Sequence, residues 1–349
     1  MPPLPRILVV NPGSSSLKLS LLGAGDAELA AAEIDSGDGG VDEGALGAFL
    51  DGPGGSYEAA GIRVVHGGRD FRAATRVDQP VVAALDRISD LAPLHNPPAV
   101  HALRLLLARD SERPVVACFD TAFHARMPEA ASLYAVPWEW IERDGVRRYG
   151  FHGLSHAYAT RWAAAELGRP VDELQLITCH LGAGASLAAV SGGVSVDTTM
   201  GFTPMEGLVM ATRAGSVDAG AVLWMQRRHG ISVEDMERLL DRESGMRGLS
   251  GTSGDMRAVL SAADGGDGRA QLAVDVYVHR LRRCIGAMAA SLPRVDALVF
   301  TGGVGENAAV IRERAVAGLG VLFAGTRVLV VHAREDLQIA HEVRALLAP

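Results

Sequence analysis

Short apolar runs alternate with glycine-rich turns along most of the chain. Residues 6–22 contain an apolar run, a turn of Asn, Pro, Gly and Ser, and a second apolar run, which predicts a β-hairpin. Further apolar runs predict strands at 62–66, 114–119, 174–179, 185–190 and 297–300. Residues 23–61 are rich in Gly, Ala and Asp, and we expect them to be the least ordered part, apart from a short helix at 45–50.

Between these strands, several stretches have sequence patterns that predict helices. Pro97 and Pro98 can open a helix because a proline in the first turn loses no hydrogen bond. Ser232 is a candidate N-cap for a helix that runs to residue 240, with acidic residues in its first turn. Helices are also predicted at 155–167, 269–291 and 335–347. Strands that alternate with helices indicate an α/β fold.

Length and composition limit the class of protein. A chain of 349 residues, 48% apolar and 21% charged, corresponds to about two globular domains. The net charge of −8 argues against a nucleic-acid partner. The apolar run at 7–10 is too short for a signal peptide, and no stretch is long enough to span a membrane. Three widely spaced cysteines indicate neither a zinc site nor a disulfide framework, so we expect a cytoplasmic protein.

The first candidate anion site lies in the predicted hairpin. Between Asn11 and Lys18, a glycine lets backbone N–H groups approach an anion, and serine hydroxyls and the lysine add donors. The spacing is not that of a Walker A loop. A plain turn with solvated serines is the alternative.

Two charged residues at strand ends are candidates for substrate chemistry. Arg63 stands beside the Gly67-Gly68 turn, and its planar guanidinium matches the geometry of a carboxylate. Asp120 directly follows the strand at 114–119, where ligand groups gather in α/β folds, and it could hold Mg²⁺ or accept a proton. The alternatives are a surface arginine and a helix-capping aspartate.

Glycine-rich segments make up the remaining candidates. His152 lies between Gly150 and Gly153, where it could donate to a transferring phosphoryl group or be a structural loop histidine. Further segments of this kind occur at 180–186, 199–215, 250–257 and 300–307, and ordinary turns are the alternative for them. The last one joins a strand to a helix, which suits a nucleotide. Residues 176–190 also repeat the pattern of the first hairpin, which predicts two phosphate-binding hairpins unless the likeness is chance.

Read in order, the motifs NPGSSSLK, RVVHGG, LAPLHNPP, FDTAFH, RYGFHG, CHLG, DTTMGFTPMEG, GDMR and TGGVGEN resemble those of the acetate kinase family, within the sugar kinase and actin superfamily. The resemblance implies two RNase H-like α/β domains with an active-site cleft between them. The first covers 1–122 plus 336–349. The second covers 123–335, with the nucleotide site and the interface of a homodimer.

The implied activity is reversible transfer of the ATP γ-phosphoryl group to acetate, which gives acetyl phosphate and ADP, with Mg²⁺ or Mn²⁺ as cofactor. By the resemblance, the catalytic residues are Asp120, His152 and Arg213. The metal residues are Asn11 and Glu335. The substrate residues are Arg63, Val65, Leu94, His95, Phe151 and Pro204. The nucleotide residues are Ser14, Ser16, Lys18, His180, Leu181, Gly182, Ala183, Gly184, Asp255, Met256, Arg257, Gly303, Val304, Gly305, Glu306 and Asn307.

Three positions depart from the family pattern. Ala183 stands where an asparagine is usual, Leu154 replaces a threonine, and Glu335-Asp336 replaces a Glu-Glu pair. A propionate or butyrate kinase is one alternative, because one methylene changes selectivity by only about 1–3 kcal/mol. The other is a non-catalytic, actin-like nucleotide-binding module, with Ala183 as a sign of lost activity.

Overall fold

The structure is a computed structural model, and it describes residues 6–13, 16–35, 41–323 and 325–348. The chain divides into two units. Unit 1 contains Met1–Ala125, Phe151–Tyr158 and Arg334–Pro349, and unit 2 contains Arg126–Gly150 and Ala159–Ala333. Residues 151–158 therefore fall in unit 1, whereas the predicted boundaries assign them to the second domain. Those boundaries stay a prediction.

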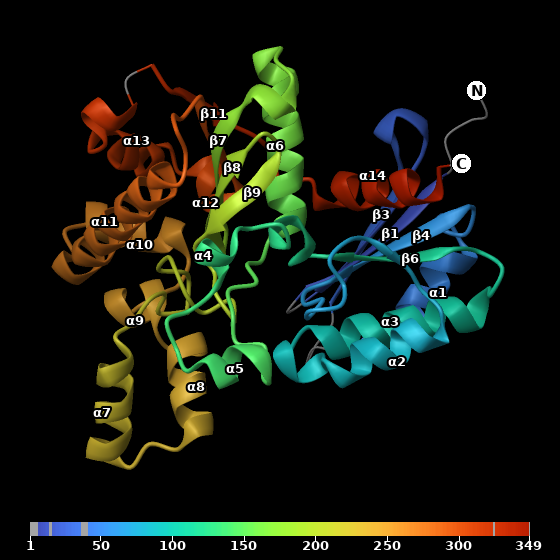
Figure 1. The fold of residues 1–349 in the computed structure, drawn as a ribbon, viewed down its shortest axis with the longest axis horizontal. Coiled ribbons are helices and arrows are strands. Elements are labelled where there is room, and N and C mark those ends of the chain that lie inside the picture. The colour runs from blue at the N-terminus through green and yellow to red at the C-terminus, as the bar shows by residue number, and fades with distance from the viewer. Residues whose placement is uncertain (1–5, 14–15, 36–40, 324, 349) are drawn as a thin grey trace. The chain divides into compact units, whose positions relative to one another are not determined.

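Each unit is built on one mixed sheet (Figure 1). The strands of unit 1, in spatial order, are β3 (Glu28–Asp35), β2 (Ser16–Leu22), β1 (Ile7–Pro12), β4 (Ala59–Val64), β6 (Val115–Phe119) and β5 (Thr75–Arg76). Those of unit 2 are β11 (Arg327–Val330), β10 (Ala297–Thr301), β7 (Gln175–Leu181), β8 (Ala185–Ser191) and β9 (Val194–Thr198).

The two sheets share one topology. In unit 1, β3, β2 and β1 are antiparallel neighbours, and β4 and β6 follow parallel to β1. In unit 2, β9, β8 and β7 are antiparallel neighbours, and β10 and β11 follow parallel to β7. The repeated hairpin pattern of the sequence therefore corresponds to β1–β2 and β7–β8, the first two strands of each sheet. The α/β class and the two-unit architecture are confirmed.

The helices of unit 1 are α1 (Glu43–Asp51), α2 (Gln79–Arg87), α3 (Asn96–Arg109) and α14 (Glu335–Leu347), and α6 (Gly153–Leu167) begins there. Those of unit 2 are α4 (Glu129–Ser132), α5 (Trp138–Glu142), α7 (Ala219–His229), α8 (Val233–Arg242), α9 (Gly245–Ser250), α10 (Met256–Asp264), α11 (Gly268–Ala290), α12 (Gly302–Asn307) and α13 (Ala309–Ala317). Short 3₁₀ turns occur at Ala24–Asp26, Ser89–Leu91, Ala122–His124, Val171–Glu173 and Gly320–Phe323.

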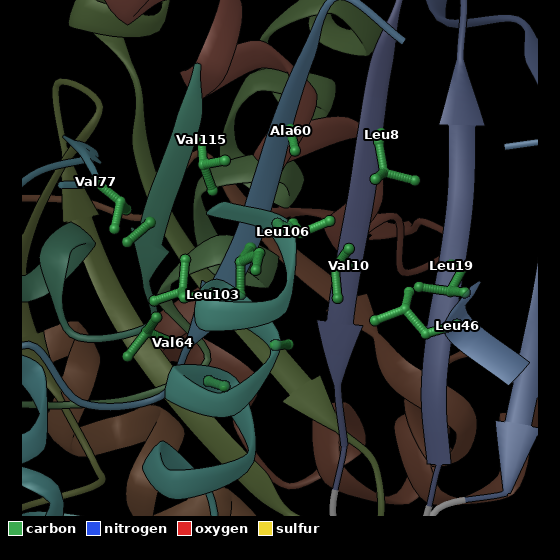
Figure 2. Packing of buried hydrophobic residues seen from close by; sticks show 14 of the residues in the cluster. Leu8, Val10, Leu19, Leu46, Ala60, Val64, Val77, Leu103, Leu106 and Val115 are labelled. Atoms are coloured by element: carbon green, nitrogen blue, oxygen red, sulfur yellow. The ribbon is translucent and has the colours of Figure 1, made fainter. Parts of the chain in front are cut away.

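The sheet of unit 1 is buried on both faces. One face packs on α1, α2 and α3, and Figure 2 shows Leu8 and Val10 of β1 in the same cluster as Leu103 and Leu106 of α3. The alternate residues Ile7 and Val9 belong to a second cluster with α14. Figure 1 accordingly shows α14 on the opposite side of β1 and β4 from α2 and α3. Continuous apolar runs such as 7–10 are what a strand buried on both faces requires.

Several predicted elements differ from the observed ones. The region 23–61, expected to be the least ordered, contains β3 and the start of β4, and the short helix expected at 45–50 is confirmed as α1. The strand predicted at 62–66 is β4, which begins at Ala59 because it pairs from there with β1, and it ends at Val64. The helix predicted at 335–347 is confirmed, and Ser232 caps α8 as predicted. In the described part of the chain, no helix has the length and apolar character needed to cross a bilayer.

Candidate active site

Four polar side chains of unit 1 form a continuous chain of contacts. The Arg63 guanidinium binds the Asp120 carboxylate, with 2.6 Å between Nη2 and Oδ2 and 3.1 Å from Nε to each oxygen. Arg63 Nη1 lies 3.4 Å from Asn11 Oδ1, and Asn11 Nδ2 donates to Glu335 Oε2 at 3.2 Å. Four predicted site residues, far apart in sequence, therefore meet.

The sheet brings these residues together. β1, β4 and β6 are parallel neighbours, and Asn11 and Arg63 each follow the paired residues Val10 and Ile62. Asp120 comes directly after β6. Because the carboxyl ends of parallel strands meet at one edge, all three side chains lie there. Glu335 is the first residue of α14, which packs on the same sheet.

Burial makes the charges of this pair interdependent. Burial raises the pKa of Asp120, and the Arg63 guanidinium and the backbone N–H of His152 oppose that shift. Burial also opposes the charged form of Arg63, but Asp120 and Glu335 outweigh it and raise the pKa of the guanidinium. The Arg63 guanidinium therefore favours the ionised form of Asp120 against the effect of burial.

The segment that carries His152 is held against Asp120 by the backbone. The N–H of Gly153 donates to the carbonyl oxygen of Asp120 at 2.9 Å. A Cβ on Gly153 would lie 2.0 Å from that oxygen, so only glycine permits this approach. His152 has a φ of 55°, a left-handed conformation that is unusual for a residue with a side chain. Such strain at a candidate catalytic residue supports a functional role.

Two polar residues that the sequence interpretation missed hold the turn after β4. The buried Asn96 side chain accepts from the N–H of His66 at 3.1 Å and donates to its carbonyl at 3.0 Å. Thr121 Oγ1 accepts from the N–H of Gly67 at 3.1 Å. Both residues lie within motifs quoted above, LHNPP and FDTAFH, but nothing in the one-dimensional pattern shows that they bind this turn. His124, buried nearby, has a pKa lowered to about 4 by burial and is neutral.

The predicted substrate residues differ in exposure. Val65 and Phe151 are buried in unit 1, whereas Leu94 is 51% exposed and His95 is partly buried. Pro204 belongs to unit 2. Val65 and Phe151 are the two apolar members of the set that the fold of unit 1 fixes in place.

Lys18 on β2 is exposed, whereas its neighbours Leu17 and Leu19 are buried. Lys18 Nζ lies 4.0 Å from Glu33 on β3, and Ser16 Oγ donates to the same carboxylate at 2.7 Å. The predicted nucleotide residue Ser14 lies outside the described residues. Lys18 on β2 pairs with Asn11 on the neighbouring strand β1, as the hairpin prediction requires.

In unit 2 the second glycine hairpin lies beside the start of α12, which directly follows β10. The carbonyl of Ala183 accepts from the N–H of Ala211 at 2.9 Å, and the N–H of Gly182 donates to the carbonyl of Gly184 at 2.9 Å. Gly302 has a φ of 78°, and a Cβ there would lie 2.9 Å from the backbone of Leu181. The predicted nucleotide residues at 180–184 and 303–307 therefore adjoin one another at the ends of β7 and β10.

The loop at 199–206 is fixed by a polar cluster of Tyr134, Arg148 and Glu206. Tyr134 donates to Glu206 at 2.5 Å, and Arg148 Nη2 donates to the same carboxylate at 2.8 Å. A Cβ on Gly201 would clash with both Tyr134 and Glu206. This cluster, which sequence interpretation did not single out, holds the backbone that carries Pro204.

Asp255 and Arg257 lie on the surface of unit 2. Asp255 is the N-cap of α10 and accepts from the N–H of Arg257 at 2.8 Å, and the two side chains form an ion pair at 2.7 Å. The hydrogen bond from Arg257 lowers the pKa of Asp255 to about 2. Met256 is buried. Asp255 therefore acts as a helix cap within unit 2, whereas the alternative given for this segment was an ordinary turn.

Arg213 is held by a residue that the sequence interpretation missed. Its Nε donates to Asp241 Oδ1 at 2.7 Å, and both side chains are partly buried. Asp241 lies on α8, whose start the sequence predicts, but its pairing with Arg213 depends on how α8 packs.

Replacing Asp241 by alanine should lower kcat about tenfold, because one charge-assisted hydrogen bond to Arg213 contributes about 1.5 kcal/mol. Steady-state kinetics will measure kcat, and thermal unfolding will show whether the variant is still folded. Asp235→Ala removes an exposed ion pair with Arg238 on the same helix and should leave kcat unchanged. An equal kcat for both variants would show that Asp241 does not position Arg213.

The oxygen donors of unit 1 fit a hard cation. Among the described residues, no three His, Cys, Asp or Glu side chains are grouped so as to hold a metal ion by themselves. Mg²⁺ usually keeps several waters and takes phosphate oxygens from its substrate. Asn11 and Glu335, whose side chains are in contact, provide an amide and a carboxylate oxygen for that partial shell.

Comparisons with known proteins agree with these motifs. The model of the acetokinase family matches residues 55–338. An acetate kinase of Synechococcus sp. (strain JA-2-3B'a(2-13)) is 52% identical over 308 residues, which cover 82% of this chain and 76% of that protein.

Two solved structures resemble the whole chain. The acetate kinase of Porphyromonas gingivalis has a TM-score of 0.89 and 32% identity, over 98% of this chain and 99% of the other. A propionate kinase from Francisella tularensis subsp. tularensis SCHU S4 has a TM-score of 0.89 and 33% identity, over 97% and 98%. With the family model matched over most of its length, this chain belongs to the acetokinase family.

Proposed function

We propose that this chain is an acetate kinase, which transfers the γ-phosphoryl group of ATP reversibly to acetate and forms acetyl phosphate and ADP. The observation that carries the proposal is the Arg63–Asp120 pair, joined through Asn11 to Glu335, in a member of the acetokinase family. In the forward direction, a carboxylate oxygen of acetate forms a bond to the γ-phosphorus, and the bond from that phosphorus to the β–γ bridging oxygen breaks.

Each residue of the site has a physical task in this scheme. Arg63 binds the carboxylate of acetate, because its planar guanidinium matches the geometry of a carboxylate. Asp120 keeps the Arg63 guanidinium oriented through its hydrogen bonds. His152 and Arg213 stabilise charge on the transferring group. Mg²⁺ would be held by Asn11 and Glu335, and it supplies neutralising charge to the phosphate oxygens when bound.

The nucleotide is proposed to bind at the two glycine segments of unit 2. The open surface at Gly303, where a Cβ would meet nothing within 4 Å, supports that placement. Ala183 has no side-chain amide to offer the phosphates, so binding there depends on the backbone. Val65 and Phe151, both buried in unit 1, form the proposed apolar surface for the substrate methyl group.

Trapping of acyl phosphate with hydroxylamine tests the function. Purified protein, Mg-ATP and acetate should yield the hydroxamate, with propionate, butyrate and a reaction without acid in parallel. Acetate giving the highest kcat/KM supports the proposal. A higher value for propionate would assign the chain to the activity of its propionate kinase relative. ADP binding without hydroxamate from any acid would instead identify a non-catalytic nucleotide-binding module.

We also propose that the protein is a cytoplasmic homodimer whose interface includes α7. No side chain of α7, which is described over its whole length, is buried, and Val217, Leu223 and Trp224 are about half exposed, at 48%, 53% and 56%. Exposed aromatic and aliphatic side chains grouped in this way are typical of a surface that binds another protein.

The three free cysteines support a reducing compartment.

Sedimentation velocity will test the dimer. Trp224→Glu should shift the protein from dimer to monomer at micromolar concentration, because a charge would be buried without a partner. Leu346→Glu, a similarly exposed apolar position on α14 of unit 1, should leave the dimer intact. A monomeric wild-type protein would contradict the proposal.

A further inference from the structure

The carboxylate of Glu306 lies between the ends of two neighbouring parallel strands in unit 2. Its Oε1 accepts hydrogen bonds from the N–H of Gly302, at 3.0 Å, and from the N–H of Ala333, at 2.9 Å. Gly302 directly follows β10, and Ala333 comes three residues after β11, the parallel neighbour of β10. One oxygen atom therefore joins the glycine segment of α12 to the chain that leaves β11.

The remaining capacity of this carboxylate is also engaged. Glu306 Oε2 lies 2.5 Å from Nδ1 of the exposed His332, and Arg312 holds the same turn through the carbonyl oxygens of Gly305 and Glu306, at 2.8 and 2.9 Å. Burial alone would raise the pKa of Glu306, but the hydrogen bonds from His332, Ala333 and Gly302 outweigh it and lower that pKa. An ionised carboxylate saturated by the protein's own donors is a poor ligand for a nucleotide, whose phosphates it would repel.

The segment that Glu306 holds lies just before Glu335, one of the two proposed metal residues, in the sequence. We call Val331, His332 and Ala333 the connector. The N–H of Val331 donates to the carbonyl of Phe300 at 2.9 Å, and the side chain of Val331 is buried, so the connector begins as a continuation of β11. Unit 2 ends at Ala333, and Glu335 follows two residues later. Two residues span at most about 7 Å, so the anchor at Ala333 limits where the Glu335 carboxylate can lie.

We propose that Glu306 is a positioning residue, which couples the glycine segment of α12 to the connector and, through it, to Glu335. The proposal deepens the kinase function proposed above and rests on it for its kinetic readout. Its structural readout, protection of the Ala333 amide, does not depend on that function.

Three variants separate positioning from direct nucleotide binding. Glu306→Ala removes the acceptor for both N–H groups. Glu306→Gln keeps an acceptor oxygen but loses the charge, and His332→Ala leaves both backbone hydrogen bonds in place. Glu306→Asp, one methylene shorter, serves if the alanine variant does not fold, and it should change each readout in the same direction by less.

We expect Glu306→Ala to speed hydrogen exchange of the connector amides at least tenfold in the protein without ligands, as measured by mass spectrometry of peptides covering 331–336. It should lower kcat roughly 10-fold to 100-fold, in line with a small misplacement of a catalytic group. The dissociation constant of ADP, measured by calorimetry without metal, should change less than twofold. Glu306→Gln and His332→Ala should stay close to wild type in exchange and within about threefold in kcat.

Two results would overturn the proposal. One is a loss of ADP affinity in Glu306→Ala that matches the loss of kcat, with connector exchange unchanged, which would make Glu306 an ordinary nucleotide contact. The other is a Glu306→Ala protein equal to wild type in exchange and in kcat. If wild type forms no acyl phosphate, the kinase proposal fails, whereas faster connector exchange in Glu306→Ala would still establish the anchor.

Discussion

The Asp120→Asn variant should form acetyl phosphate at least about 10³-fold more slowly than wild type. Asp120 is almost completely buried, and its carboxylate holds Arg63 through three contacts of 2.6 to 3.1 Å. Asparagine has nearly the same shape but no charge, so Arg63 loses its counter-ion and the site loses its buried acid. Effects of this kind on single groups reach about 10²–10⁴-fold in rate. Hydroxamate formation under saturating acetate and Mg-ATP measures the loss.

A matched control distinguishes this effect from the loss of any arginine–aspartate pair. Asp86→Asn breaks the exposed pair between Asp86 on α2 and Arg104 on α3. Exposed pairs contribute about 0–1 kcal/mol to stability, so this variant should keep wild-type kcat and unfold within a few degrees of wild type. If Asp120→Asn retained more than a tenth of wild-type kcat, Asp120 would not be the central acid of the site.

Replacing Gly153 by alanine should lower kcat roughly 100-fold and also destabilise the protein. The new Cβ would lie 2.0 Å from the carbonyl oxygen of Asp120 and 2.9 Å from Cβ of Phe123. Because the first of these is a backbone atom, the segment must move and carries both His152 and the Asp120 hydrogen bond with it. Overpacking of this kind costs about 1–3 kcal/mol in the free energy of unfolding, and a shift of 1 Å at a catalytic group can lower the rate about 10²-fold.

Gly286→Ala is the matched control, for which we expect higher stability and unchanged kcat. Gly286 lies inside the long helix α11, and a Cβ there would meet no atom within 4 Å. Alanine should therefore stabilise the helix by about 0.5–1 kcal/mol and leave kcat unchanged. Urea unfolding and acyl phosphate assays on both variants will decide. A Gly153→Ala protein as active as wild type would mean that the approach of Gly153 to Asp120 does not fix the site.

The sequence alone determined the elements whose pattern is local. Residues 335–347 form the predicted helix, Ser232 caps α8, and the two glycine hairpins are β1–β2 and β7–β8. Each depends on contacts between residues close in the chain, such as a cap three residues from its donor or a turn between adjacent apolar runs. The ordered series of motifs likewise pointed to the family, because it needs no knowledge of which residues touch.

Tertiary structure decided the elements and contacts that depend on distant residues. β3 forms within the Ala-rich region 23–61 because β2 offers it an open edge, and no local signal marks it. Asn96, Thr121 and Asp241 support the candidate site through partners 28 to 54 residues away. Side chains that meet only after packing leave no periodic trace in the sequence.

Glu306 shows the same division most clearly. Its motif, TGGVGEN, places it among the predicted nucleotide residues, yet the structure directs its carboxylate to the N–H groups of Gly302 and Ala333. Gly302 is four residues away, but Ala333 is 27 residues away, on the chain leaving the next parallel strand. From the sequence, the residue types of this motif indicate only that polar side chains stand at the end of a strand. Which partner each side chain takes is decided when parallel strands bring their ends to a common edge.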